Sequence, residues 1–148
     1  MSNKVRKVER ITDIVKVLNG GIEFYQDAME KVDSHGAKTV FGRVVSAKQQ
    51  TVEKLQPFAI AESGEYEKDS DFVVGARNYF TKALALISTD SDLTYVKQLE
   101  EVEDKTLEVI REALEVDQPE ECKMALMYTL NTANETHSQM KSLQQTMS

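Results

Sequence analysis

Apolar residues recur along most of the chain at steps that alternate between three and four, and this spacing predicts long helices. Such a spacing places the apolar side chains on one side of a helix, where they form a seam that packs against other helices. An additional amphipathic helix is predicted over about residues 71–87, whose apolar residues also share one face. The four long helices are expected over about residues 3–33, 37–62, 92–116 and 119–145.

The breaks between these helices are of two kinds, and their lengths set the topology. Short turns near residues 33–36 and 117–118 join the first helix to the second and the third long helix to the fourth, so each pair is antiparallel. The segment between the pairs has nearly 30 residues, which is enough to carry the chain back along the bundle. The sequence therefore predicts an all-α fold with one domain over residues 1–148. This domain is a four-helix bundle with one long crossover that contains the additional short helix.

Two acidic residues, Glu100 and Glu103, occupy adjacent seam positions of the helix predicted over residues 92–116. A carboxylate that is buried without a partner is costly, so another polar group must meet it there. These two residues therefore mark the candidate site of the protein. The complete seam reads Leu93, Val96, Glu100, Glu103, Leu107, Ile110 and Leu114.

Three further polar residues fall at the same height of the predicted bundle. Lys48 interrupts the seam of the second helix, His137 interrupts that of the last helix, and Tyr25 belongs to the seam of the first. Lys48 lies about eleven residues into its helix and the two glutamates about eight to eleven into theirs, which at about 1.5 Å per residue agrees within a turn. The side chains expected to form one buried polar network are Tyr25, Lys48, Glu100, Glu103 and His137.

Short motifs in three helices resemble those of ferritin-like proteins. The motifs are residues 21–28 (GIEFYQDA), residues 100–104 (EEVED) and His137, followed six residues later by Leu143. Over about residues 11–145, the chain is similar to bacterial four-helix-bundle proteins of unknown function that are grouped near the ferritin-like superfamily. The resemblance implies a ferritin-like bundle with a carboxylate-rich site at its middle. It implies no activity, because none is established for these proteins.

The chain departs from the ligand pattern of a complete two-metal site. Such a site takes a Glu from each of two helices and a Glu-x-x-His motif from each of the other two. Asn134 stands where the last helix should supply Glu ahead of His137, and residues 50–53 contain no His. Lys48 also brings a positive charge to the seam. We therefore expect a degenerate site that holds no metal and no cofactor, in a protein that is not an enzyme.

The first hypothesis is a metal-free polar network with a structural role. Lys48 would pair with Glu100 or Glu103, and His137 would bond the other glutamate. Charge-assisted hydrogen bonds make such a cluster tolerable inside a bundle, and the cluster would fix which helices pair and in what register.

Two alternatives stay open. In the first, Glu100, Glu103 and His137 hold an iron, manganese or zinc ion, with help from Glu23 or Glu53. In the second, the protein is an interaction module. An apolar face left over from the core, such as that of residues 71–87, would then bind a second copy to form a homodimer.

Charge and cysteine content exclude several classes of partner and site. The net charge is −7 and the pI about 4.9, with twelve acidic and three basic residues over 90–121, so a nucleic-acid partner is not expected. No apolar stretch approaches the length of a membrane span, and none resembles a signal segment at the N-terminus. Cys122 is the only cysteine, so no internal disulfide forms and a cytoplasmic location is expected.

A few other residues have simple structural interpretations. Gly20 and Gly21 lie inside the first helix, where they either bend it or let a neighbour approach closely. Cys122 is expected to act as a small buried apolar residue. The residues expected to fill the core or its edge include Met124, Met127, Tyr128 and Met140.

Overall fold

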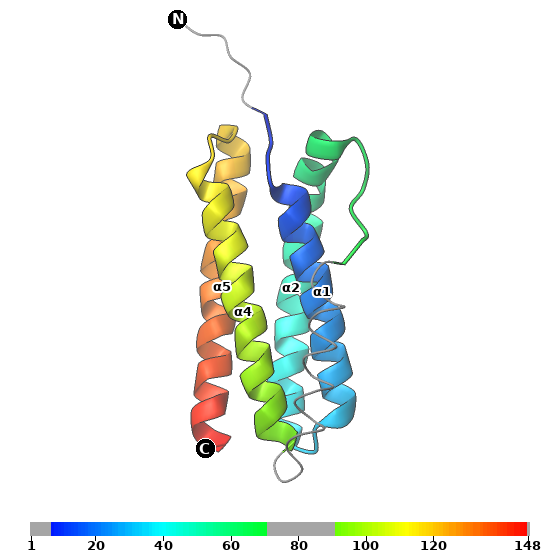
Figure 1. Cartoon of the computed structure of the whole chain (residues 1–148), viewed down its shortest axis with the longest axis vertical. Helices are drawn as coiled ribbons and strands as arrows, with labels where there is room; N and C mark the ends of the chain where they lie inside the picture. Colours follow the sequence, from blue (N-terminus) through cyan, green and yellow to red (C-terminus); the bar gives the residue numbers. More distant parts are fainter. Residues whose placement is uncertain (1–6, 71–90, 148) are drawn as a thin grey trace, which may run out of the picture.

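The computed structural model describes residues 7–70 and 91–147, and these residues form helices joined by short connections, with no strand among them (Figure 1). The prediction of an all-helical chain is thus confirmed for this part. The additional helix expected at 71–87 lies outside the described residues. The helices are α1 (Ile11–Lys31), α2 (His35–Ser63), α4 (Ser91–Glu115) and α5 (Glu120–Met147).

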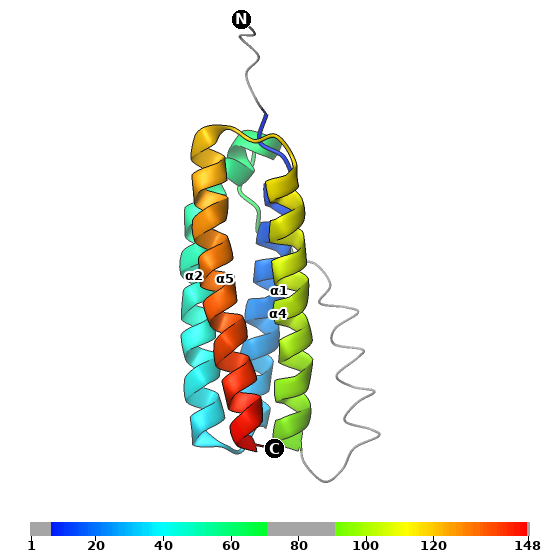
Figure 2. The same cartoon turned by 90° about the vertical axis from the view of Figure 1, so that its left-hand side faces the viewer.

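The four helices lie side by side as a bundle. Helix α1 packs against α2 and α4, and α5 packs against α4 and α2, so α1 and α5 occupy one diagonal. Figures 1 and 2 show that α1 and α5 run in one direction and that α2 and α4 run in the other. Neighbouring helices are therefore antiparallel, and each helix faces two others across the core. None of the helices over 7–70 and 91–147 has a stretch of the length and hydropathy needed to span a bilayer.

Helix α1 begins later than its sequence predicts because its N-terminal cap comes from another helix. Arg10 precedes it at φ 67° and provides no side-chain cap. Glu62, near the end of α2, accepts hydrogen bonds from the backbone nitrogens of Ile11 (2.8 Å) and Thr12 (3.0 Å) and from the Thr12 hydroxyl (3.1 Å). A carboxylate at this position satisfies free N–H groups of the first turn and suits the helix dipole.

The turn between α1 and α2 is held by side chains from both sides. Ser34 caps α2 by accepting a hydrogen bond from the Ala37 backbone nitrogen at 3.1 Å. Asp92, in the first turn of α4, accepts from the backbone nitrogens of Asp33 (3.0 Å) and Ser34 (2.9 Å). The start of α4 is thereby fixed to the end of the first hairpin.

Gln118 links the turn between α4 and α5 to the segment that precedes α1. Its side-chain amide accepts from the Glu9 backbone nitrogen at 3.0 Å and donates to the Glu9 carbonyl at 2.6 Å. Cys122 follows one turn later, is fully buried, and lies 3.6 Å from the Gln118 amide oxygen. Burial raises the pKa of the Cys122 thiol to about 11, so this residue packs as a small apolar group, as expected.

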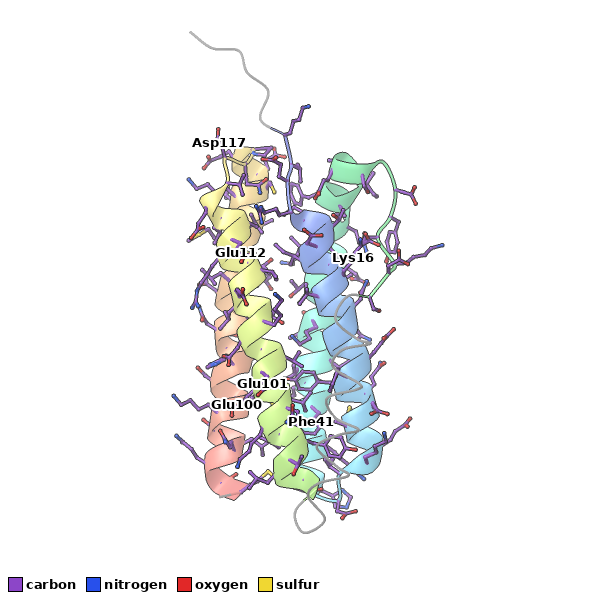
Figure 3. All side chains as sticks on the ribbon, in the orientation of Figure 1. Lys16, Phe41, Glu100, Glu101, Glu112 and Asp117 are labelled. Atoms are coloured by element: carbon purple, nitrogen blue, oxygen red, sulfur yellow. The ribbon has the colours of Figure 1, made fainter. Side chains whose placement is uncertain are left out.

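The core consists of two apolar clusters that share no buried residue. One cluster joins the end of α1 and the start of α2 to the start of α4, and it contains Phe24, Phe41, Val96 and Leu99. The other joins the opposite halves of the same helices to the first half of α5, and it contains Ile14, Leu55, Ile110 and Leu126. Figure 3 shows Phe41 inside the lower half of the bundle, at about the height of Glu100 and Glu101.

Three residues expected in the core or at its edge lie on the surface instead. The exposed fraction is 66% for Met124, 49% for Met127 and 45% for Tyr128. The prediction was wrong because these residues lie away from the side of α5 that carries Cys122, Leu126 and Met140. Met140, by contrast, is fully buried.

Candidate functional site

A single carboxylate stands at the centre of the candidate site. Glu103 of α4 is fully buried, and one side chain from each of the other helices bonds to it. The Tyr25 hydroxyl of α1 donates to Glu103 Oε2 at 2.8 Å, and the Thr136 hydroxyl of α5 donates to Oε1 at 2.7 Å. Lys48 Nζ of α2 lies 3.0 Å from Oε2 and 3.3 Å from Oε1. All four helices therefore meet at one carboxylate group.

The polar atoms of this network are compensated inside the protein. Lys48 is 3% exposed and Thr136 4%, while Tyr25 is fully buried. The Lys48 ammonium also lies 5.7 Å from the centre of the Tyr25 ring, within the range of a cation–π contact. Over the described parts of the chain, every buried side-chain nitrogen or oxygen has a hydrogen-bond partner. A network satisfied in this way avoids the large penalty of an unpaired buried charge.

Gly21 of α1 lies directly beside the lysine that reaches the carboxylate. A Cβ atom built at Gly21 would lie 3.4 Å from Lys48 Cε and 3.5 Å from Lys48 Nζ. The Lys48 stem therefore lies against the α1 backbone with room for no more than a methyl group between them. This is the second of the two effects expected of the glycine pair, and α1 continues through it without a break.

The environment of Tyr25 keeps its hydroxyl protonated. Burial raises the pKa of Tyr25 well above 10.0, and the negative charge and hydrogen bond of Glu103 raise it further. The phenol therefore keeps its proton at neutral pH and donates a hydrogen bond to the carboxylate.

Glu100 does not join the network, although it is one turn from Glu103. It is only partly buried and lies at the rim between α4 and α5. Desolvation raises the pKa of Glu100, while the charge of His137 opposes this shift. With its amide turned to donate, Gln144 of α5 reaches Glu100 Oε1 at 3.0 Å.

The position of His137 differs from the expectation that it bonds a core glutamate. Its Nε2 lies 2.9 Å from Asp104 Oδ1, with the two side chains 30% and 67% exposed, so the contact is on the outside of α4 and α5. Its neighbour Thr136 enters the core in its place. One residue along a helix turns the side chain by about 100°, which is enough to exchange the core for the surface.

The two auxiliary carboxylates of the metal hypothesis are also remote from the core. Glu23 is exposed, and its Oε1 accepts a hydrogen bond from the Ser70 hydroxyl at 3.0 Å. Glu53 is exposed on α2. Within residues 7–70 and 91–147, no three His, Cys, Asp or Glu side chains are grouped so that they could hold a metal ion. The structure therefore does not bring together the ligand set of Glu100, Glu103 and His137.

Fold and site together define a helical bundle with a buried ion pair at the junction of its two apolar clusters. The chain belongs to the family described as a domain of unknown function, DUF2383, whose model matches residues 6–116. The expected membership in a family of unknown function is thereby confirmed. The matched region includes Tyr25, Lys48 and Glu103, and it ends before Thr136. No curated protein and no solved structure matches the chain.

Proposed function

We propose that the protein is a ferritin-like bundle without catalytic activity, in which an internal ion pair replaces the metal centre. The observation that carries this proposal is the 3.0 Å contact between Lys48 Nζ and Oε2 of the fully buried Glu103. The ammonium group lies where a cation bound to that carboxylate would lie. The α1–α2 and α4–α5 hairpins, with α2 and α4 parallel, support the ferritin-like assignment and a long crossover.

Electrostatics argues against a metal ion at the same carboxylate. Lys48 already supplies the positive charge that Glu103 requires, and a divalent ion beside it would be repelled strongly in a low-dielectric core. Tyr25 and Thr136 take further lone pairs of the carboxylate through hydrogen bonds. A metal would need to displace the ammonium, which would then be buried without a counter-ion.

The role proposed for the network is to select one arrangement of the four helices. Apolar seams tolerate a shift of one helix by a turn, about 5.4 Å, because one apolar residue replaces another. A shift of that size would remove Glu103 from Lys48, Tyr25 or Thr136 and leave buried polar groups unpaired. Breaking a buried pair in this way costs about 3–5 kcal/mol, so the network penalises every other register.

Metal titration tests the proposal directly. Calorimetry with Fe²⁺, Mn²⁺ and Zn²⁺, and elemental analysis of untagged protein purified without chelator, are expected to show no stoichiometric metal. A Glu103→Gln variant provides the control for weak binding to surface carboxylates. One metal ion per chain that is lost in this variant would overturn the proposal. We further propose a cytoplasmic location, which the single Cys122 supports.

A further inference from the structure

Helix α5 carries a protruding apolar pair on its outer surface. Met124 and Tyr128 are 66% and 45% exposed. Large apolar side chains that cluster on a surface usually mark a contact site. The Tyr128 ring has the Lys54 ammonium of α2 3.8 Å from its centre. The pair therefore lies on the side of α5 that is next to α2, since residues four apart share one face of a helix.

A hollow of about 430 Å³ lies at the other end of the same two helices. Its apolar wall comes from Val40 of α2 and Leu143 of α5, and Ser142 and Thr146 lie beside them on α5. Arg43 of α2 also lines the hollow, and it has no ion pair among the residues that the structure describes. The hollow thus combines an apolar wall with polar groups that have bonding capacity left.

The protruding pair and the hollow share one face of α5. Met124 and Ser142 are 18 residues apart, as are Tyr128 and Thr146. Eighteen residues make five helical turns, so the members of each pair point in the same direction and are separated by about 27 Å. A protrusion and a hollow at the two ends of one face are the elements of a self-complementary surface.

We propose that this face binds a second copy of the chain in an antiparallel, two-fold symmetric dimer. The symmetry axis would cross α5 near Glu135, midway between the protruding pair and the hollow. Met124 and Tyr128 of each copy would then enter the hollow of the other. A second copy is the favoured occupant because one molecule supplies both halves of the contact, which closes the assembly at two chains.

Charge makes this dimer weak and dependent on salt. Glu135 is eleven residues, or about three turns, from Met124 and therefore lies on the same face. In the proposed dimer the two Glu135 carboxylates approach each other at the axis, and each copy carries a net charge of −7. Both repulsions are screened by added salt. We therefore expect dimerisation at high protein concentration, strengthened by sodium chloride and by Glu135→Gln.

Sedimentation equilibrium over micromolar to millimolar protein tests the association. The mass is expected to rise from 16.7 kDa toward twice that value. Met124→Asp is expected to weaken the dimer by about tenfold or more, because it places a charge in the apolar hollow. Ile60→Asp is the matched control, since Ile60 is 46% exposed but points to the other flank of α2, six residues after Lys54. A mass of one chain at every concentration and salt level would overturn the proposal, and so would equal effects of the two variants.

Cysteine cross-linking tests the antiparallel register. Under mild oxidation Glu135→Cys is expected to form a disulfide-linked dimer, because this position lies at the axis. Met124→Cys alone is expected to stay uncross-linked, whereas Met124→Cys combined with Thr146→Cys forms the dimer, because an axis at Glu135 places position 146 of one copy opposite position 124 of the other. The native Cys122 is fully buried and serves as the unreactive background. Cross-linking through Met124→Cys alone would place the two α5 helices in parallel and contradict the proposal.

Discussion

At the scale of single residues, the main feature is the dependence of Glu103 on three partners. The carboxylate has no exposed surface, so every interaction that stabilises its charge comes from Tyr25, Lys48, Thr136 and the surrounding dipoles. If one partner is removed, the full cost of taking Glu103 out of water remains, but fewer hydrogen bonds and ion pairs compensate for that cost. The effect of a substitution here thus depends on what remains buried more than on what is removed.

Lys48→Met is expected to destabilise the protein by about 3–5 kcal/mol, because Glu103 would stay buried without its cation. Urea unfolding followed by circular dichroism measures the change. Lys105→Met is the control: Lys105 is exposed and, among the residues that the structure describes, pairs with Glu108 at 3.8 Å, so its loss should change stability by less than about 1 kcal/mol. Equal effects of the two substitutions would show that Lys48 contributes no more than a surface lysine.

Tyr25→Phe is expected to cost about 1–2 kcal/mol at neutral pH, because it deletes one donor to the buried carboxylate. It should also change the alkaline response. The raised pKa of Tyr25 means that the unfolded chain loses its tyrosine proton near pH 10.0 while the folded chain keeps it. Stability from this group is therefore complete below pH 10.0 and declines as the pH rises above it.

Urea unfolding at a series of alkaline pH values measures this slope, which should be shallower in Tyr25→Phe than in the parent. Tyr128→Phe is the control, because Tyr128 is 45% exposed. An alkaline slope that is unchanged by Tyr25→Phe would contradict the linkage.

At the scale of elements, helix α5 shows what limits prediction from sequence. The sequence pattern predicts a buried seam that includes His137. In the structure the buried side chains of α5 instead include Thr129 and Thr136, and they follow one another at alternating steps of four and three residues. Threonine is a polar residue, so a hydrophobic pattern does not assign it to a buried seam. Here Thr129 bonds its hydroxyl to the Ala125 carbonyl one turn back at 2.8 Å, so it is buried without an unmet donor.

The other seams were predicted more closely because their interruptions are unambiguous. Lys48 and Glu103 are charged residues inside largely apolar seams, and the structure places them in contact. The alternating steps also predict a buried Glu100, yet this residue is only partly buried and lies at the edge of the seam. Spacing gives the face of a helix to within about one residue, and a site needs better than that.

The start of α1 depends on Glu62, which is distant in sequence and therefore hidden from local rules. Glu62→Gln is expected to cost about 1–2 kcal/mol, because the amide is a weaker partner for the first-turn nitrogens and carries no charge. Hydrogen exchange measured by NMR should show faster exchange at Ile11 and Thr12. Glu65→Gln, in the exposed segment after α2, is the control and should leave these amides unchanged.

At the scale of the whole molecule, the ion pair lies between two apolar clusters, and Ile22 packs against both of them. The cluster containing Phe41 and the cluster containing Leu55 share the four helices but no buried residue. Each cluster alone would accept several pairings of its helices, since volume and pattern are what an apolar core requires. The contact between Lys48 and Glu103 ties both clusters to one common register.

Lys48→Met combined with Glu103→Leu tests this role. No buried charge is left, although the buried Tyr25 hydroxyl loses its acceptor, so stability is expected to recover to within about 1–3 kcal/mol of the parent. The double variant is expected to lose its single packed arrangement of helices. Its amide resonances should broaden, and it should bind a dye that reports exposed apolar surface. The single variant Lys48→Met is the comparison. Sharp resonances and no dye binding in the double variant would show that apolar packing alone sets the register.

The close approach of Lys48 to Gly21 couples shape to charge. One methyl group at Gly21 fits at ordinary contact distance from the lysine stem, whereas the branched side chain of Gly21→Val would force the ammonium away from Glu103. A substitution that adds only apolar atoms would therefore weaken the ion pair between Lys48 and Glu103. This effect requires the ion pair. Gly21→Val is therefore expected to reduce stability less in the Lys48→Met, Glu103→Leu double variant than in the parent.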